Sequence, residues 1–333
     1  MKAMVLDEIA PIDSAPLKMR ERDEPKPAAG EVRIAVRCCA ICRTDLHVIE
    51  GELPRRKMPV IPGHQIVGVV DELGEGCKRL EVGRRVGVAW LRHTCGRCRF
   101  CRGGRENLCA EQRFTGYHAD GGYATAAVAP EDYVYEIPDA FDDVQAAPLL
   151  CAGIVGYRAL KRANVPDGGR LAIYGFGSSA HVIAQIALHR GCELYVVTRG
   201  EGHQRLARQM GAAWAGETAD EMPVKADSAI IFAPVGTLVP AALEKLEKGG
   251  TLSLAGIYMT PIPELDYDRH VFYERDIRSV TANTRDDGRE LLAAAAAIPI
   301  RPHTTTYPLA EANRALQDLK SDRISGTGVL VMG

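Results

Sequence analysis

The stretch LAIYGFGSSAHVIAQIALHRG, residues 171–191, decides how this chain folds. Its first part is a short apolar run typical of a buried strand, and the segment after the glycines has the character of a helix. Between them, GFGSSA at 175–180 has the form G-x-G-x-x-A. This position between strand and helix makes the motif specific and predicts a turn that binds the phosphates of a dinucleotide.

Six residues form the predicted phosphate-binding turn. Gly175 is expected to make the tight bend, Gly177 to let a pyrophosphate approach the backbone, and Ala180 to let the helix pack closely. The helix N-terminus would face the phosphates. The turn is completed by Phe176, Ser178 and Ser179.

The alternation of strand and helix continues along the chain. Further strands are predicted at ELYVVT (193–198), ADSAIIFA (226–233) and TLSLAGIY (251–258), with helices at HQRLARQMGA (203–212) and LVPAALEKLEKGG (238–250). Such alternation is the pattern of a parallel sheet with helices on both faces. The fold class is therefore α/β, with a Rossmann-type doubly wound sheet.

The end of the second strand of this sheet bears on which nicotinamide cofactor is used. An acidic residue at this place binds the ribose hydroxyls of NAD, but here Thr198 occupies it and Arg199 follows. An arginine can pair with the 2′-phosphate of NADP. The sequence favours NADP(H) over NAD(H), with a solvated Arg199 and a ribose contact from Glu201 as the alternative.

Residues 31–150 have a different pattern, rich in short β-branched runs such as EVRIAVRCCAI (31–41) and QIVGVVDEL (65–73). After residue 283 an Ala-rich helix is predicted at 285–297, and the closing strand ISGTGVLVMG (324–333) can return to the first domain. We predict two domains: a β-rich domain from 1–150 with 284–333, and the dinucleotide-binding domain at 151–283.

Composition excludes several classes of protein. The chain has 333 residues, 46% hydrophobic and 25% charged, with a formal net charge of −2. This balance gives no reason to expect a nucleic-acid partner or an anionic membrane surface. The N-terminus has acidic residues where a signal peptide needs an apolar core, and no run reaches the roughly 18 apolar residues of a membrane span. We expect a cytoplasmic protein.

Ten cysteines in such a chain point to metal binding or catalysis rather than disulfides. Four of them lie in TCGRCRFCRGGRENLC (94–109), with the spacing C-x2-C-x2-C-x7-C. Cys95, Cys98, Cys101 and Cys109 can close on one tetrahedral zinc at about 2.3 Å. An iron–sulfur cluster and four free thiols are the rival interpretations. A saturated site of this kind is structural; the arginines in the loop also allow a nucleic-acid zinc ribbon, which the acidic overall charge argues against.

Cys42, His64 and Cys151 form a second candidate metal set. Two thiolates and one imidazole leave one tetrahedral position open, which is the arrangement of a catalytic zinc. Three residues this far apart in sequence are a weak signal by themselves, and Cys151 alone would be interpreted as a small buried apolar residue.

The chain resembles the zinc-dependent medium-chain alcohol dehydrogenases, and is most similar to their bacterial branch that includes the cinnamyl-alcohol-dehydrogenase-like enzymes. The resemblance covers essentially the whole chain. Apart from the four-cysteine loop and GFGSSA, it is carried by CRTDLH (42–47), PGHQIVGVV (62–70), VGRRVGV (82–88), DGGYA (120–124) and PLLCAGIVGYRAL (148–160). It implies a GroES-like catalytic domain built from both chain ends, an inserted Rossmann domain, and an active site in the cleft between them.

The resemblance also implies roles for individual residues. Cys42, His64 and Cys151 would hold a catalytic zinc whose open position takes an alcohol or carbonyl oxygen. Thr44 would accept the alcohol proton and His47 would pass it toward solvent through the nicotinamide ribose. Asp45 would orient His64 through its far ring nitrogen. The competing interpretation makes Thr44 and Asp45 helix caps and His47 a surface residue.

For the cofactor and substrate the resemblance implies less. The nicotinamide carboxamide would meet backbone groups near Val235, Gly256 and Ala282, and Trp90 would line the substrate pocket, with Tyr117 and Phe114 as weaker candidates. Expected partners are a small alcohol or aldehyde, two zinc ions per subunit and NADP(H), in a homodimer or homotetramer. Nucleic acid and membrane are not expected.

Gln65 is a departure from the family pattern, which has glutamate after the zinc histidine in many members. Because the three ligands and the proton relay are intact, we expect an active enzyme. Two alternatives remain at this point: a zinc-independent quinone-type reductase of the same superfamily, and a non-enzymatic redox sensor that binds zinc and nucleotide.

Overall fold

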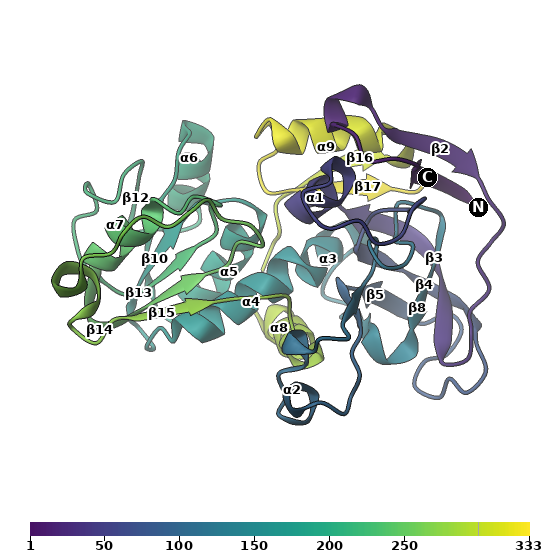
Figure 1. Cartoon of the computed structure of the whole chain (residues 1–333), viewed down its shortest axis with the longest axis horizontal. Coiled ribbons are helices and arrows are strands. Elements are labelled where there is room, and N and C mark those ends of the chain that lie inside the picture. The colour runs from purple at the N-terminus through teal and green to yellow at the C-terminus, as the bar shows by residue number, and fades with distance from the viewer. Residues whose placement is uncertain (299) are drawn as a thin grey trace. The chain divides into compact units, whose positions relative to one another are not determined.

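The structure is a computed structural model that describes residues 1–298 and 300–333 (Figure 1). The chain forms two compact units. Unit 1 contains Met1–Ala152, Asn283–Ala296 and Arg301–Gly333, and unit 2 contains Gly153–Ala282 with Ala297–Ile300. The domain division predicted from sequence places its boundaries within two residues of the main ones, after 150 and before 284, but assigns 297–300 to the first domain.

Unit 2 contains a parallel sheet. Among the described residues it has six strands in the order β12-β11-β10-β13-β14-β15. In chain order this is 3-2-1-4-5-6, the arrangement of the Rossmann fold. The strands are β10 (Arg170–Tyr174), β11 (Glu193–Val197), β12 (Trp214–Gly216), β13 (Ala226–Ile231), β14 (Leu246–Leu254) and β15 (Asp276–Ser279). The predicted α/β class and doubly wound sheet are confirmed.

Helices connect these strands: α4 (Ala152–Ala163) precedes β10, and α5 (Ser178–His189), α6 (Glu201–Gln209) and α7 (Leu238–Glu244) lie between later strands. One prediction was wrong at its end. The helix expected over 238–250 stops at Glu244, and the strand expected from 251 begins at Leu246. Gly249, with φ of 73°, and Gly250 interrupt the apolar pattern that would have marked this strand.

Unit 1 is built on a mixed sheet in the order β16-β17-β3-β4-β5-β9, with β8 paired to β3 (Figure 1). Its central pair is β3 (Glu31–Ala40) and β4 (Gln65–Leu73), flanked by β5 (Arg85–Val88), β8 (Ala126–Pro130) and β9 (Val134–Glu136). A separate antiparallel pair, β1 (Lys2–Leu6) and β2 (Leu17–Glu21), packs its apolar side chains into the same core. This is the β-rich domain expected from the sequence.

The C-terminal segment returns to unit 1. β17 (Thr327–Val331) pairs with β3, and β16 (Thr304–Pro308) adds to its other edge. The predicted closing strand and the helix α8 (Arg285–Ala297) are confirmed, whereas β16 and α9 (Ala312–Lys320) were not predicted. In the part of the chain that the structure describes, no helix has the length and apolar character needed to span a membrane.

Candidate active site and metal centres

Cys42 and His64 meet because of the register of β3 and β4. Ala40 pairs with Gln65, so Cys42, two residues beyond β3, and His64, one residue before β4, flank the same end of the strand pair. Cys42 also caps the N-terminus of α1 (Arg43–Glu50), where its sulfur accepts the backbone N–H of Thr44 at 3.3 Å. The Cys42 sulfur lies 3.3 Å from Nε2 of His64.

Cys151 completes this cluster from another part of unit 1. It follows the 3-10 helix η4 (Ala147–Leu150), which packs on β3, β4 and β5. The ligand atoms of Cys42, His64 and Cys151 all lie within 4.8 Å of one another. The predicted set therefore converges on one point, with His64 fully buried and both cysteines half-buried.

Asp45 holds this arrangement in place through hydrogen bonds to its carboxylate. One carboxylate oxygen lies 3.1 Å from Nδ1 of His64 and accepts the N–H of Gly63 at 3.3 Å, and the other accepts the N–H of Cys42 at 2.9 Å. Asp45 is 2% exposed. Because Nδ1 of His64 meets a carboxylate, Nε2 is left to face the two sulfurs as a metal ligand would.

The charges in the cluster fit a bound cation. The pKa of Cys42 is lowered well below its ordinary value, chiefly because Cys151 hydrogen-bonds to its sulfur. The same hydrogen bond, with burial, raises the pKa of Cys151. Burial opposes charge on His64, but the Cys42 thiolate and Asp45 carboxylate outweigh it and raise the His64 pKa to about 10. Protons on Cys151 and His64 thus balance a thiolate, and a divalent cation among these donors would replace them.

Trp90 covers the outer side of the His64 ring. Its indole meets His64 edge-on at 4.8 Å between ring centroids and stacks on Phe114 at 4.7 Å. Tyr117 stacks on the same indole at 5.8 Å. All three aromatics named from the sequence therefore lie together beside the cysteine–histidine cluster.

Thr44 and His47, the two residues predicted to transfer the proton, lie on α1. Thr44 is buried beside Cys42, and His47 lies one turn further along the helix. Nδ1 of His47 contacts the carboxylate of Glu52, which lies just beyond the helix. Glu52 was not named from the sequence.

The four-cysteine loop forms a second cluster. The sulfurs of Cys95, Cys98, Cys101 and Cys109 lie within 4.8 Å of one another. Cys101 lies 3.9 Å from Cys95 and 3.5 Å from Cys98, close to the edge of about 3.8 Å that a zinc tetrahedron with 2.3 Å bonds requires. Backbone N–H groups of Arg97 and Cys98 lower the pKa of Cys95 to about 7, which favours the thiolate that a metal binds.

A buried ion pair anchors this loop within unit 1. Glu106, in the 3-10 helix η2 (Glu106–Leu108), accepts from the Arg285 guanidinium at 2.8–3.1 Å and from its backbone N–H at 2.8 Å. Arg285 begins α8 and also lies over the ring of Tyr133 at 4.8 Å. The pair lowers the pKa of Glu106 against the opposing effect of burial. Sequence reasoning missed it because the two residues are 179 positions apart.

In unit 2 the predicted cofactor residues gather at one edge of the sheet. GFGSSA follows β10, Thr198 and Arg199 follow β11, and Val235, Gly256 and Ala282 follow β13, β14 and β15 respectively. The carboxyl ends of parallel strands share an edge, which is where ligands bind in open α/β sheets. Gly175 has φ of 89°, and a Cβ there would lie 3.1 Å from the backbone of Ala233. Thr198 is buried, and Arg199 is exposed.

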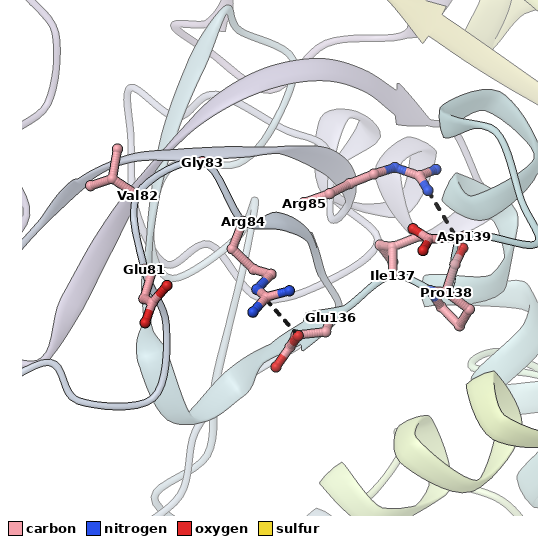
Figure 2. A pocket seen from close by; sticks show the side chains of 9 residues that line it. All are labelled: Glu81, Val82, Gly83, Arg84, Arg85, Glu136, Ile137, Pro138 and Asp139. Carbon is pink, nitrogen blue, oxygen red and sulfur yellow. Dashed lines mark hydrogen bonds and ion pairs between the residues drawn. The ribbon is translucent and has the colours of Figure 1, made fainter.

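A surface hollow in unit 1 is separate from all these residues. Figure 2 shows it between the turn before β5 and the end of β9, where Arg84 pairs with Glu136 at 3.4 Å. Arg85 donates to the carbonyl of Pro138 at 3.4 Å. None of the predicted site residues lines this hollow.

Known families match both parts of the chain. Residues 28–139 match the family described as alcohol dehydrogenase GroES-like domain. Residues 175–297 match the family described as zinc-binding dehydrogenase. The first match contains the four-cysteine loop, Cys42 and His64, and the second begins at Gly175.

Individual proteins are similar over their full lengths. The chain is 50% identical to the "Probable alcohol dehydrogenase AdhA" of Mycobacterium tuberculosis (strain CDC 1551 / Oshkosh), covering 100% of this chain and 97% of that protein. It is 37% identical to an alcohol dehydrogenase of Geobacillus stearothermophilus, covering 99% and 98%. Among solved structures, a cinnamyl alcohol dehydrogenase from Sorghum bicolor superposes with a TM-score of 0.89 at 25% identity, covering 99% and 97%.

The fold and the two cysteine-based clusters define a class: an oxidoreductase with a zinc-type GroES-like domain and a Rossmann domain for a nicotinamide cofactor. Within that class, the chain belongs to the zinc-dependent medium-chain alcohol dehydrogenase family. The resemblance inferred from the sequence is confirmed. The family assignment favours a zinc dehydrogenase over the quinone-type reductase and over the non-enzymatic sensor.

Proposed function

We propose that this enzyme interconverts alcohols and aldehydes at a zinc ion held by Cys42, His64 and Cys151. The convergence of these three ligand atoms within 4.8 Å carries the proposal. When bound, zinc would act there as a Lewis acid toward the alcohol or carbonyl oxygen. Asp45 keeps the His64 ring turned toward the two sulfurs by accepting at its Nδ1.

Proton transfer is assigned to Thr44 and His47. The Thr44 hydroxyl would accept the alcohol proton and hand its own proton on toward His47, whose imidazole passes it to solvent. Thr44 is held at the start of α1 by its N–H on the Cys42 sulfur, and His47 lies one turn later on the same helix. The His47 side chain is 14% exposed, so a mostly buried imidazole still has access to water.

A second zinc is assigned to the four-cysteine loop, giving two ions per chain. This site is saturated by four sulfurs and has a structural role. Metal content measured on the purified protein tests the stoichiometry: two zincs per chain are expected. One zinc with quinone turnover would favour the quinone-type reductase, and nucleotide binding without turnover would favour the sensor.

NADP(H) is the proposed cofactor, with GFGSSA holding the pyrophosphate and Arg199 the 2′-phosphate. Support comes from the exposed Arg199 directly after the buried Thr198, at the place where NAD enzymes carry a carboxylate. Val235, Gly256 and Ala282 are assigned to the carboxamide end because they follow the last three strands at the same edge.

The proposed substrates are primary alcohols and their aldehydes, aliphatic or aromatic, bound against Trp90. This indole contacts the ring of the His64 ligand and is itself backed by Phe114 and Tyr117. A panel of aliphatic and aromatic aldehydes with NADPH and NADH tests both the pocket and the cofactor. Replacement of Trp90 with alanine should raise KM for aromatic aldehydes more than for short aliphatic ones.

We further propose a cytoplasmic homodimer or homotetramer joined through the Rossmann sheet. β15 is an edge strand, with Ile277 40% exposed on it, and an edge strand offers unpaired backbone groups to a second copy. Analytical ultracentrifugation of the protein and of Ile277→Pro should show a dimer or tetramer and a smaller species, respectively.

A further inference from the structure

Glu52 is a carboxylate that lies outside the motifs that identify the family, yet it contacts a residue of the proposed relay. Its Oε2 meets Nδ1 of His47. The Glu52 side chain is 54% exposed, whereas that of His47 is 14% exposed. The His47 side of the pair is therefore mostly buried in unit 1, and the Glu52 side is in contact with water.

The backbone beyond α1 is built to bring Glu52 back onto His47. The N–H groups of Gly51, Glu52 and Leu53 all point to the His47 carbonyl, the latter two at 3.0 and 3.3 Å. Gly51 has φ of 79°, and a Cβ there would lie 2.6 Å from the side chain of Ile9. The backbone of the turn is thus fixed both by its hydrogen bonds and by its close packing, which holds the Cα of Glu52 near His47.

The neighbouring carboxylate, Glu50, already has partners. Glu50 accepts from Lys320 at 2.9 Å and from the N–H of Ile12 at 2.9 Å, and Lys320 also lies 3.5 Å from Asp13. Glu52 contacts the His47 imidazole directly. A carboxylate accepts only from a protonated ring nitrogen, so Glu52 selects the tautomer with hydrogen on Nδ1 and leaves Nε2 as the acceptor.

We propose that Glu52 is the outer acid–base group of the proton path, an inference that rests on the roles proposed for Thr44 and His47. During alcohol oxidation the alcohol carbon gives its hydride to the oxidised nicotinamide, which becomes reduced, and the hydroxyl proton enters the path. Nε2 of His47 takes up one proton while Nδ1 gives its own to the Glu52 carboxylate. Glu52 releases that proton to water, and aldehyde reduction runs the same transfers backward.

Two Glu52 variants test this assignment in the full-length, zinc-loaded enzyme. Glu52→Gln keeps the size of the side chain but cannot take up a proton, whereas Glu52→Asp can. Glu8→Gln is the matched control, because Glu8 is also exposed and adjoins Ile9, which packs against the same turn. Single-turnover rate, kcat, KM, solvent deuterium isotope effect, zinc content and unfolding midpoint are measured for each.

Glu52→Gln should lower the single-turnover rate roughly tenfold, below the approximately 100- to 10,000-fold range of a full general acid–base group. KM, zinc content and unfolding midpoint should stay unchanged, the isotope effect should rise, and added imidazole or acetate should restore the rate. Glu52→Asp should keep part of the wild-type single-turnover rate. A rate equal to that of Glu8→Gln, or a loss that buffer does not restore, overturns the inference. If His47→Asn also leaves the single-turnover rate unchanged, the proposed relay itself is wrong. If His47→Asn lowers the rate and Glu52→Gln does not, the relay stands and only the role of Glu52 is wrong.

Discussion

Replacing Asp45 with asparagine should weaken the catalytic zinc without removing a ligand. The carboxylate accepts three N–H groups, from Cys42, Gly63 and His64, at 2.9, 3.3 and 3.1 Å. An asparagine amide has one oxygen, so its NH2 group must face at least one of these donors. A buried donor left without a partner costs about 1–3 kcal/mol. Loss of such an outer partner typically weakens metal binding about 10- to 100-fold, or roughly 1.4–2.7 kcal/mol.

Competition with a chromophoric chelator measures this change, and metal content after chelator treatment shows which ion is lost. Asp45→Asn should release one zinc per chain more readily and keep the ion of the four-cysteine loop. Asp71→Asn is a suitable control, since Asp71 lies on β4 and bonds the partly exposed Arg33 at 2.9 Å. If Asp45→Asn holds both zincs as tightly as this control, Asp45 does not orient the ligand His64 and our reasoning is refuted.

Three further changes have defined outcomes. Glu106→Ala should lower the free energy of unfolding by about 3 kcal/mol, because it leaves the mostly buried Arg285 without its partner; urea unfolding measures it. The pKa of Glu106 is lower in the folded state than the unfolded pKa of about 4.3, so this stabilisation is fully present above pH values near 4.3. It is lost as pH falls through the folded-state pKa, and the free energies of unfolding of wild type and variant should become equal in acid. Arg199→Asp should move the ratio of kcat/KM for NADPH over NADH toward NADH; a strong NADH preference in the wild type that this variant leaves unchanged contradicts our cofactor proposal. Gln65→Glu should lower the unfolding midpoint, since the Gln65 amide is fully buried without a hydrogen-bond partner among the described residues and a carboxylate is costlier there; an inactive zinc-loaded wild type that Gln65→Glu restores would contradict the expected activity.

The Rossmann half was predictable because its signals are local. The segment around GFGSSA shows its strand, its turn and its helix within about twenty residues, and the structure has β10 and α5 there. Where the local signal is ambiguous, prediction failed. The residues LEKGG continue the apolar spacing of α7, yet Leu246 already belongs to β14, because pairing with Ala226 of β13 outweighs helix propensity.

The grouping of Cys42, His64 and Cys151 was expected from the family motifs and not from their spacing, and the strand register explains why Cys42 and His64 converge. The sequence predicts the strands β3 and β4 but does not show which residues of the two strands lie opposite each other. Once Ala40 lies opposite Gln65, Cys42 and His64 must be neighbours. Leu150 packs against Gly87 on β5, and Cys151, the next residue, joins Cys42 and His64 within 4.8 Å.

Glu52 and the Glu106–Arg285 pair show what sequence reasoning lacks. Glu52 contacts His47 across a turn that packs against Ile9, and Glu106 meets Arg285 from 179 positions away. Both contacts depend on tertiary structure that local sequence does not show. An exposed glutamate after a helix is ordinarily a solvated charge, so composition gives Glu52 no weight. Its contact with the half-buried His47 changes that, because a proton leaving a buried relay needs a group that meets both the imidazole and water. In sequence, a glutamate that serves as an outer relay group looks the same as an ordinary surface glutamate. Only the turn that brings Glu52 onto His47 distinguishes the two.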